Sequence, residues 1–147
     1  MSRAKEYLEQ IEAWDTMIDE MVAELDMVKA KAYKITSSMQ DVPSFGGGTS
    51  DKVGDGATSL VALGDELDEA IDRFVNLKRE AAALLKQIRK AKYYKVLSMK
   101  YFRYMTFQDI AKEMGCSVRN AQKLHGRALQ VFDRLLAEKE EQGREPV

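Results

Sequence analysis

Cysteine, histidine and proline are scarce in this sequence of 147 residues, which holds one cysteine, one histidine and two prolines. A single cysteine, Cys116, can form no disulfide within the chain, which is typical of proteins from a reducing cytoplasm. One histidine beside one cysteine supplies too few ligands for the usual zinc sites, so we expect no metal and no other cofactor. Two prolines and nine glycines also leave little material for the many turns of a β fold.

Long hydrophobic runs are absent as well. The longest apolar run covers residues 81–85, whereas a membrane-spanning helix needs ~20 apolar residues. The N-terminal residues lack the apolar stretch of a signal peptide. We therefore expect a soluble cytoplasmic protein with no membrane partner. The polar residues show no cluster of acid, base and nucleophile, so we do not expect an enzyme.

Two long apolar repeats are present instead. From residue 4, and again from residue 60, apolar residues recur at alternating spacings of three and four, which predicts helices with one apolar face. The first repeat consists of Ala4, Tyr7, Ile11, Trp14, Ile18, Met21, Leu25, Val28, Ala32, Ile35 and Met39. The second consists of Leu60, Leu63, Leu67, Ala70, Phe74, Leu77, Ala81, Leu84, Ile88 and Ala91. The sequence thus predicts an all-α fold with two coiled-coil-like helices, over about residues 2–39 and 58–91.

A glycine-rich segment, residues 40–57, separates these two helices and is expected to form a loop. Five of the nine glycines lie between positions 46 and 56. No Gly-Lys-Ser/Thr follows them and no strand precedes them, which argues against a phosphate-binding loop. Both helices begin acidic and end basic, so antiparallel packing brings opposite charges together. We therefore predict a long antiparallel helical hairpin over residues 2–91, formed within one chain or exchanged between two.

Charge is divided unevenly along the chain, although the formal net charge is only -1. Residues 1–41 and 42–85 each carry a net charge of -4, residues 86–136 carry +9, and residues 137–147 carry -2. A basic block flanked by acidic ones is typical of a module that binds a polyanion. A solvated basic face without a partner is the alternative.

Within the basic block, residues 106–125 have the pattern of a helix-turn-helix. Thr106 and Ser117 are suited to cap two successive helices, and Gly115 suits the tight turn between them. The apolar residues of each helix fall on one face: Phe107, Ile110, Ala111 and Met114 on the first, and Ala121, Leu124, Ala128 and Val131 on the second. We predict that residues 92–137 form a helix-turn-helix DNA-binding domain.

The second of these helices would present its first turns to DNA. Its outward-facing positions hold Val118, Arg119, Gln122 and Lys123. Arginine and lysine suit guanine, glutamine suits adenine, and valine can touch the methyl group of thymine in the major groove. The basic residues placed to meet phosphates are Arg127, Lys112, Arg103 and Lys100. His125 is expected to be packed or to face a phosphate, and the aromatic residues at positions 93–104 favour a core over stacking on single-stranded bases.

Three runs of this domain occur in a known pattern: KVLSMKY at residues 95–101, TFQDIAKEMGCS at residues 106–117, and AL at residues 128–129. With them, residues 93–135 resemble region four of bacterial sigma factors, which reads the upstream promoter element. The resemblance implies that the outward-facing residues of the second helix read bases. Position 118 is often arginine in sigma factors and is valine here, so the same promoter element is not expected.

A helical N-terminal part, an SDKVG run at residues 50–54 and an LHGRAL run at residues 124–129 occur together in this chain. In this combination the whole chain is similar to phage-encoded regulators of the ArpU/RinA type. The resemblance implies a phage or prophage transcription regulator, often an activator of late genes, with RNA polymerase as a partner.

We therefore expect a hairpin that mediates homodimerisation or partner docking, and a basic domain that binds double-stranded DNA in a sequence-specific manner. Contacts to phosphates would supply affinity, and dimerisation would place two recognition helices on repeated half-sites. Two other functions fit the same pattern: a coiled-coil adaptor whose basic block binds an acidic protein, and a DNA-packaging component such as a small terminase subunit. Residues 138–147 are polar and are expected to fray.

Overall fold

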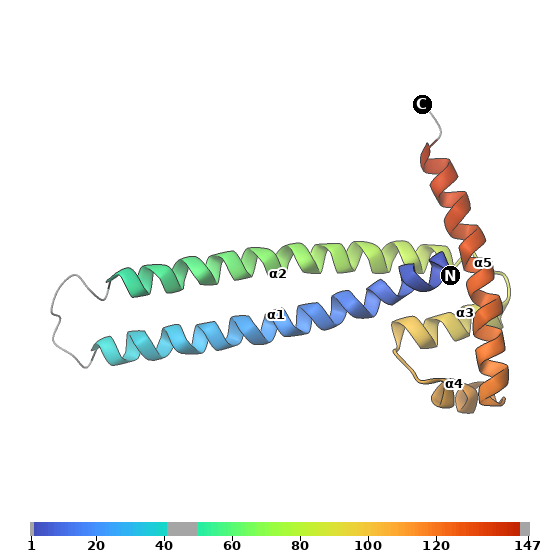
Figure 1. Cartoon of the computed structure of the whole chain (residues 1–147), viewed down its shortest axis with the longest axis horizontal. Helices are drawn as coiled ribbons and strands as arrows, with labels where there is room; N and C mark the ends of the chain where they lie inside the picture. Colours follow the sequence, from blue (N-terminus) through green and yellow to red (C-terminus); the bar gives the residue numbers. More distant parts are fainter. Residues whose placement is uncertain (1, 41–49, 145–147) are drawn as a thin grey trace. The chain divides into compact units, whose positions relative to one another are not determined.

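The computed structural model describes the backbone of residues 2–40 and 50–144, and the side chains of residues 2–34 and 58–143. Figure 1 shows its helices. Their bounds are α1 (Arg3–Gln40), α2 (Ser50–Leu85), α3 (Ala91–Leu97), the π-helical turn η1 (Ser98–Phe102), α4 (Phe107–Met114) and α5 (Val118–Arg144). The predicted all-α class is confirmed, because no strand occurs in the described backbone. None of the described helices combines the length and the apolar character needed to cross a membrane.

Close contacts divide the chain into two compact units, and the division does not follow the order of the sequence. One unit holds the described residues up to Ala13 together with those from Phe74 onward, and the other holds those from Trp14 to Arg73. The sequence pattern places a boundary between the hairpin and the DNA-binding domain after residue 91. The structure instead groups the first turns of α1 and the last turns of α2 with the C-terminal helices.

The first helix, α1, matches its predicted bounds to within one residue at either end. Ser2 precedes it, and the Ser2 hydroxyl accepts a hydrogen bond from the backbone N–H of Lys5 at 3.3 Å, which satisfies one free N–H group at the helix start. Every apolar position of the repeat from Ala4 to Ala32 is buried or half-buried. The heptad spacing therefore predicts inward positions of α1, but it misses Leu8, which lies outside the repeat and is fully buried.

The second helix, α2, starts and ends earlier than its repeat predicts, at Ser50–Leu85 in place of residues 58–91. The predicted start is wrong because Gly54 and Gly56 lie inside the helix. A glycine costs a helix only ~1 kcal/mol relative to alanine, which a long helix tolerates. The rest of the predicted glycine-rich loop, residues 41–49, lies outside the described residues.

The predicted end of α2, at residue 91, is wrong because the helix ends at Leu85. No glycine or proline marks this turn in the sequence. The backbone N–H groups of Gln87 and Ile88 donate to carbonyls three residues back, at 3.1 and 3.0 Å, which tightens the last turn. Lys90 is extended (φ -80°, ψ 116°) and precedes α3. Ile88 is nevertheless only 8% exposed. The repeat therefore predicts correctly that Ile88 is buried, but not that it lies outside the helix. Ala91, the last position of the repeat, is exposed and opens α3.

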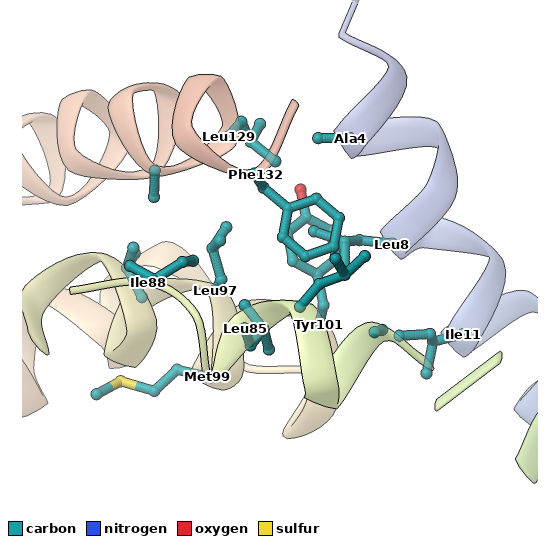
Figure 2. Close-up of a cluster of buried hydrophobic side chains, with 14 of the residues drawn as sticks. Ala4, Leu8, Ile11, Leu85, Ile88, Leu97, Met99, Tyr101, Leu129 and Phe132 are labelled. Atoms are coloured by element: carbon teal, nitrogen blue, oxygen red, sulfur yellow. The ribbon is translucent and has the colours of Figure 1, made fainter. Parts of the chain in front are cut away.

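The core of the first unit joins α1, α2, α3, η1, α4 and α5, and Figure 2 shows part of it. Its largest fully buried side chains include Phe132 from α5, Leu8 from α1 and Leu85 from α2. The ring of Phe132 packs against that of Tyr7, with 5.8 Å between the centroids. Full burial of a side chain such as leucine contributes ~1.5–3 kcal/mol. The start of α1 is therefore a structural part of the unit that holds the C-terminal helices.

Polar contacts add to this core where α1 begins. The Asp133 carboxylate of α5 accepts hydrogen bonds from the backbone N–H of Ala4 at 2.6 Å and from the Ser2 hydroxyl at 3.0 Å. An anionic group is stabilised at a helix N-terminus, because the free N–H groups there carry a partial positive charge. Asp133 therefore caps α1 from a distant part of the chain.

The C-terminal helix α5 continues to Arg144, so residues 138–144 of the tail that is expected to fray are helical in the structure. Two ion pairs link these last turns to other helices. The Lys139 ammonium lies 2.5 Å from the Glu80 carboxylate of α2, and the Glu140 carboxylate pairs with the Arg3 guanidinium of α1. Residues 145–147 lie outside the described part of the chain.

Candidate nucleic-acid interface

Side-chain caps fix the starts of α4 and α5. Thr106 is extended (φ -75°, ψ 160°), and its Oγ1 accepts a hydrogen bond from the backbone N–H of Asp109 at 3.2 Å. The Oγ of Ser117 accepts one from the backbone N–H of Asn120 at 3.1 Å. Both caps are confirmed as the sequence predicts them, and the second one orders the first residues of α5.

Gly115 makes the turn between α4 and α5. Its backbone is left-handed (φ 68°, ψ 38°), a conformation that costs a residue with a Cβ ~1–2 kcal/mol. The Gly115 N–H donates to the carbonyl of Lys112 at 3.3 Å, and the Cys116 N–H donates to that of Ala111 at 3.0 Å, so carbonyls at the end of α4 are satisfied. Among the described residues, no neighbouring atom lies within 4 Å of the place that a Cβ would take. Gly115 is therefore needed for its backbone angle and not for space.

Small side chains allow α4 and α5 to pack closely. Ala111 of α4 is 4% exposed, and Ala121 and Ala128 of α5 are fully buried. Ile110 is fully buried in the same cluster, and Leu124 is half-buried against it. Because α3 and α4 both pack against α5, they hold α5 in its orientation within this unit.

The four predicted base-reading residues lie in the first two turns of α5, and all four are exposed. They are Val118, Arg119, Gln122 and Lys123. Arg119 and Lys123 are one turn apart and lie on the same side of the helix. Val118 is a large apolar side chain left 38% exposed. We call the surface formed by these four residues the reading face.

The four predicted phosphate-contacting residues differ in their surroundings. Two of them are exposed on α4 and α5, namely Lys112 and Arg127. Arg103 is also exposed, and its guanidinium lies 3.4 Å from the Glu113 carboxylate. Lys100 is half-buried, with its ammonium 4.7 Å from the centroid of the Phe107 ring. Arg103 and Lys100 therefore already have partners within the chain.

His125 lies on the inner side of α5, beneath the reading face. It is 9% exposed, and its Nε2 is 2.7 Å from the Tyr101 hydroxyl oxygen. Its ring also meets that of Phe107 edge-on, with 5.1 Å between centroids. Burial, and to a smaller degree the positive charges of Lys100 and Lys5, lower the pKa of His125 to about 4. The imidazole is therefore neutral near pH 7 and belongs to the core, which is one of the two roles predicted for it.

Most of the aromatic stretch before α4 belongs to the core as well, although Tyr94 is 39% exposed. Val96, Leu97 and Tyr101 are buried, and Tyr93 is half-buried. Burial, and then the negative charge of Glu9, raise the pKa of Tyr101. A buried phenol bonded to a histidine has no free face for a nucleobase, so the core interpretation is confirmed for these residues.

A second group of basic residues beside the reading face is missed by sequence reasoning. Arg89 and Lys90, in the connection between α2 and α3, line one hollow together with Arg127 and Arg134 of α5. Their only signal in the sequence is that they belong to the basic block. Tertiary packing, which no local pattern reports, brings the two segments together.

A protein family matches residues 34–133 of the chain, and its description is "Protein of unknown function (DUF1492)". The matched span runs from the last turns of α1 to near the middle of α5. No curated protein and no solved structure matches the chain. These comparisons supply no function, and they assign the chain neither to sigma-factor region four nor to the ArpU/RinA type.

Proposed function

The chain belongs to the DUF1492 family, whose function is unknown, and we propose from its own residues that it binds double-stranded DNA in a sequence-specific manner. The observation that carries this proposal is the reading face. Arg119, Gln122 and Lys123 are exposed on the first turns of a helix whose opposite side is buried. A helix presented in this way, after α4 and a tight glycine turn, has the form of a DNA-binding helix-turn-helix.

The start of α5 enters the major groove in this proposal. Arg119 and Lys123 donate to the N7 and O6 atoms of guanine, and Gln122 pairs with the N6 and N7 atoms of adenine. The Val118 side chain meets the methyl group of thymine. Each good pairing of this kind discriminates against a wrong base by ~1–3 kcal/mol, so three or four of them suffice for a specific site.

Phosphate contacts supply the sequence-independent part of the affinity. Arg127 and Lys112 are exposed, and in this proposal they contact the phosphate groups of the DNA directly. Arg103 exchanges its Glu113 partner for a phosphate at little cost, because an exposed ion pair contributes only ~0.2–1 kcal/mol. The Lys100 ammonium stays above the Phe107 ring and attracts a phosphate from that position.

An antiparallel hairpin of α1 and α2 is part of the proposal. In one compact unit, burial and then the nearby Glu80 carboxylate raise the pKa of Tyr7, so these two side chains are neighbours. In the other unit, the Arg73 guanidinium lies 5.7 Å from the centroid of the Trp14 ring. Moving forward along α1 from Tyr7 to Trp14 thus corresponds to moving back along α2 from Glu80 to Arg73, as antiparallel packing requires.

A homodimer formed through this hairpin is proposed as well. The second unit leaves large apolar side chains at its surface: Met17, Val22, Met27, Tyr33, Val61 and Ile71. Exposed apolar groups of this size are typical of interaction surfaces. A dimer would place two reading faces on half-sites one helical turn of DNA apart, or a multiple of it.

The sequence resemblances support a role as a phage or prophage regulator of late genes that works with RNA polymerase in the host cytoplasm. The same exposed apolar side chains favour one competing function, a coiled-coil adaptor that binds an acidic protein. A small terminase subunit is a third. Light scattering separates the regulator from the packaging component, because a monomer or dimer supports the regulator and a large ring supports DNA packaging.

Fluorescence anisotropy with a random-sequence duplex tests DNA binding itself. We expect wild-type protein to bind with an affinity that falls steeply as salt rises. The Arg119→Ala/Lys123→Ala variant should bind ~10-fold more weakly or worse, because it loses two positive charges that attract the phosphates of any duplex.

The matched control is Lys29→Ala/Lys31→Ala, which removes the same charge from exposed positions of α1. It should bind like wild type. No binding by wild-type protein at low salt would refute the proposal, and so would equal losses in the two variants.

A further inference from the structure

Three adjoining hollows lie along one flank of α5. Two of them lie between α5 and the segment from the end of α2 to the start of α3, and the third is also lined by the end of α4 and the turn after it. The largest has a volume of about 570 Å³. The other two, of about 370 and 460 Å³, share Arg127 with it. We call this surface the basic groove, after the six basic residues that line it: Arg89, Lys90, Lys92, Lys123, Arg127 and Arg134.

Positive charge dominates the basic groove. All six basic residues are exposed, and the described residues that line the hollows include no aspartate or glutamate. Like charges on both walls of a concave surface repel each other and focus the field into the space between them. An anion in that space relieves the repulsion, so the groove suits a polyanion.

The groove continues the reading face along α5. Arg119, Lys123, Arg127 and Arg134 are four, four and seven residues apart, which keeps them on one side of the helix. From Lys123 to Arg134 the helix rises ~16 Å. Each strand of duplex DNA carries one phosphate per ~3.4 Å of its axis, so the groove is long enough to follow several successive phosphates.

The floor of the largest hollow is apolar, with Ile88, Tyr93 and Val131 among its lining residues. Deoxyribose presents a C–H surface that such a floor can contact, while charged groups at the rim meet phosphate oxygens. The Lys90 ammonium lies 5.2 Å from the centroid of the Tyr93 ring, which holds its charge at the rim. Arginine at the rim can bind a phosphate through two parallel hydrogen bonds.

We propose that the basic groove binds the sugar-phosphate backbone of the same duplex whose base edges the reading face contacts. The inference rests on the proposed function and adds Arg89, Lys90, Lys92 and Arg134 to its DNA contacts. An acidic protein segment would also match the charge and the floor of the groove. It would not account for the continuous line of cations from the reading face into the groove. The groove therefore raises affinity for any DNA sequence and leaves the choice of sequence to the reading face.

The salt dependence of binding counts these contacts, because the logarithm of affinity falls with the logarithm of salt concentration by ~0.9 per phosphate neutralised. On a random-sequence duplex we expect Arg89→Gln/Arg134→Gln to lower this slope by about 2, with weaker binding at every salt concentration. Lys92→Gln is a second, single change in the same groove and should lower the slope by about 1. Circular dichroism confirms that the variants remain folded.

The matched control is Lys29→Gln/Lys31→Gln, which loses the same charge from exposed positions of α1 and should keep the wild-type slope. Wild-type slopes in both groove variants would overturn the inference and point to an acidic protein as the occupant. If Arg119→Ala/Lys123→Ala still weakens binding in that case, the proposed function stands without the groove. Absence of DNA binding by wild-type protein would overturn both.

Discussion

Two glycines of the basic domain, Gly115 and Gly126, have different structural roles. Gly115 has a φ of 68° in the turn that presents the reading face, whereas Gly126 lies within helix α5. Neither has a neighbouring atom of the described residues within 4 Å of its missing Cβ. Backbone conformation is therefore the property that separates them.

Replacing each glycine with alanine should change stability in opposite directions. Gly115→Ala should lower the free energy of unfolding by ~1–2 kcal/mol, because alanine is strained in the left-handed region. Gly126→Ala should raise it by ~0.5–1 kcal/mol, because alanine favours the helix. Urea unfolding followed by circular dichroism measures both, and a loss of stability in Gly126→Ala would contradict this account.

His125 shows what the sequence leaves open at the scale of single residues. Its partner, Tyr101, is 24 positions away, and no spacing rule links the two. The apolar neighbours of His125 on α5 indicate an inward position, which is why a packed histidine could be predicted. The hydrogen bond that satisfies its ring could not, because η1 and α5 meet only in the folded unit.

The free energy of unfolding should depend on His125 between about pH 6.5 and pH 4. The pKa of its imidazole is lowered from 6.5 to about 4 in the folded chain. The contribution of the neutral ring is complete above pH 6.5, and it is lost as pH falls toward 4, because the unfolded chain then binds a proton that the folded chain does not. The loss is on the order of 2 kcal/mol.

Urea unfolding at about pH 7.5 and about pH 4.5 measures this loss, with His125→Gln as the comparison. The variant should be less stable at neutral pH and should show a smaller decrease on acidification. Equal decreases in the two proteins would assign the acid sensitivity to carboxyl groups and not to His125.

The starts of α4 and α5 are easier to predict from the sequence than the end of α2. The starts of α4 and α5 carry local signals in Thr106 and Ser117, and both are confirmed. The end of α2 carries no such signal, because the chain leaves the helix where Ile88 reaches a core assembled from distant segments. The last turns of α5 likewise form ion pairs with α1 and α2 that the composition of α5 does not reveal.

The cap that Asp133 provides to α1 should contribute measurably to stability. Asp133→Ala leaves the N–H of Ala4 without its acceptor, and we expect the free energy of unfolding to fall by ~1–2 kcal/mol. Glu138→Ala, an exposed site on the same helix, should change it by less than ~0.5 kcal/mol. Equal effects in urea unfolding would show that Asp133 acts only through its charge.

At the scale of the whole molecule, the chain is organised differently from its sequence pattern. A charge pattern that changes sign after residue 85 suggests a separate basic domain, but Leu8 and Leu85 are fully buried in the core that supports this domain. The exposed positions on the first turns of α5 are predictable from the sequence, because they follow from one helix and its cap. The basic groove was not, because its two walls meet only after folding.

A fragment that begins at residue 92 should therefore fail to fold alone. It would expose the surfaces of α3 and α5 that α1 and α2 cover. We expect low helicity and no cooperative thermal transition by circular dichroism, whereas the full chain should melt cooperatively. A cooperative transition of the fragment near that of the full chain would contradict this account.

The central claim is that the exposed first turns of α5 read a DNA sequence. Selection of duplexes from a random library by the full chain tests it most directly. We expect one recurring sequence, bound ~10³-fold or more tightly than random duplex, with a relaxed preference at one position when Gln122→Ala is used. A folded wild-type protein that recovers no common sequence would contradict the claim, and so would recovery of the same sequence with equal affinity by Arg119→Ala/Lys123→Ala.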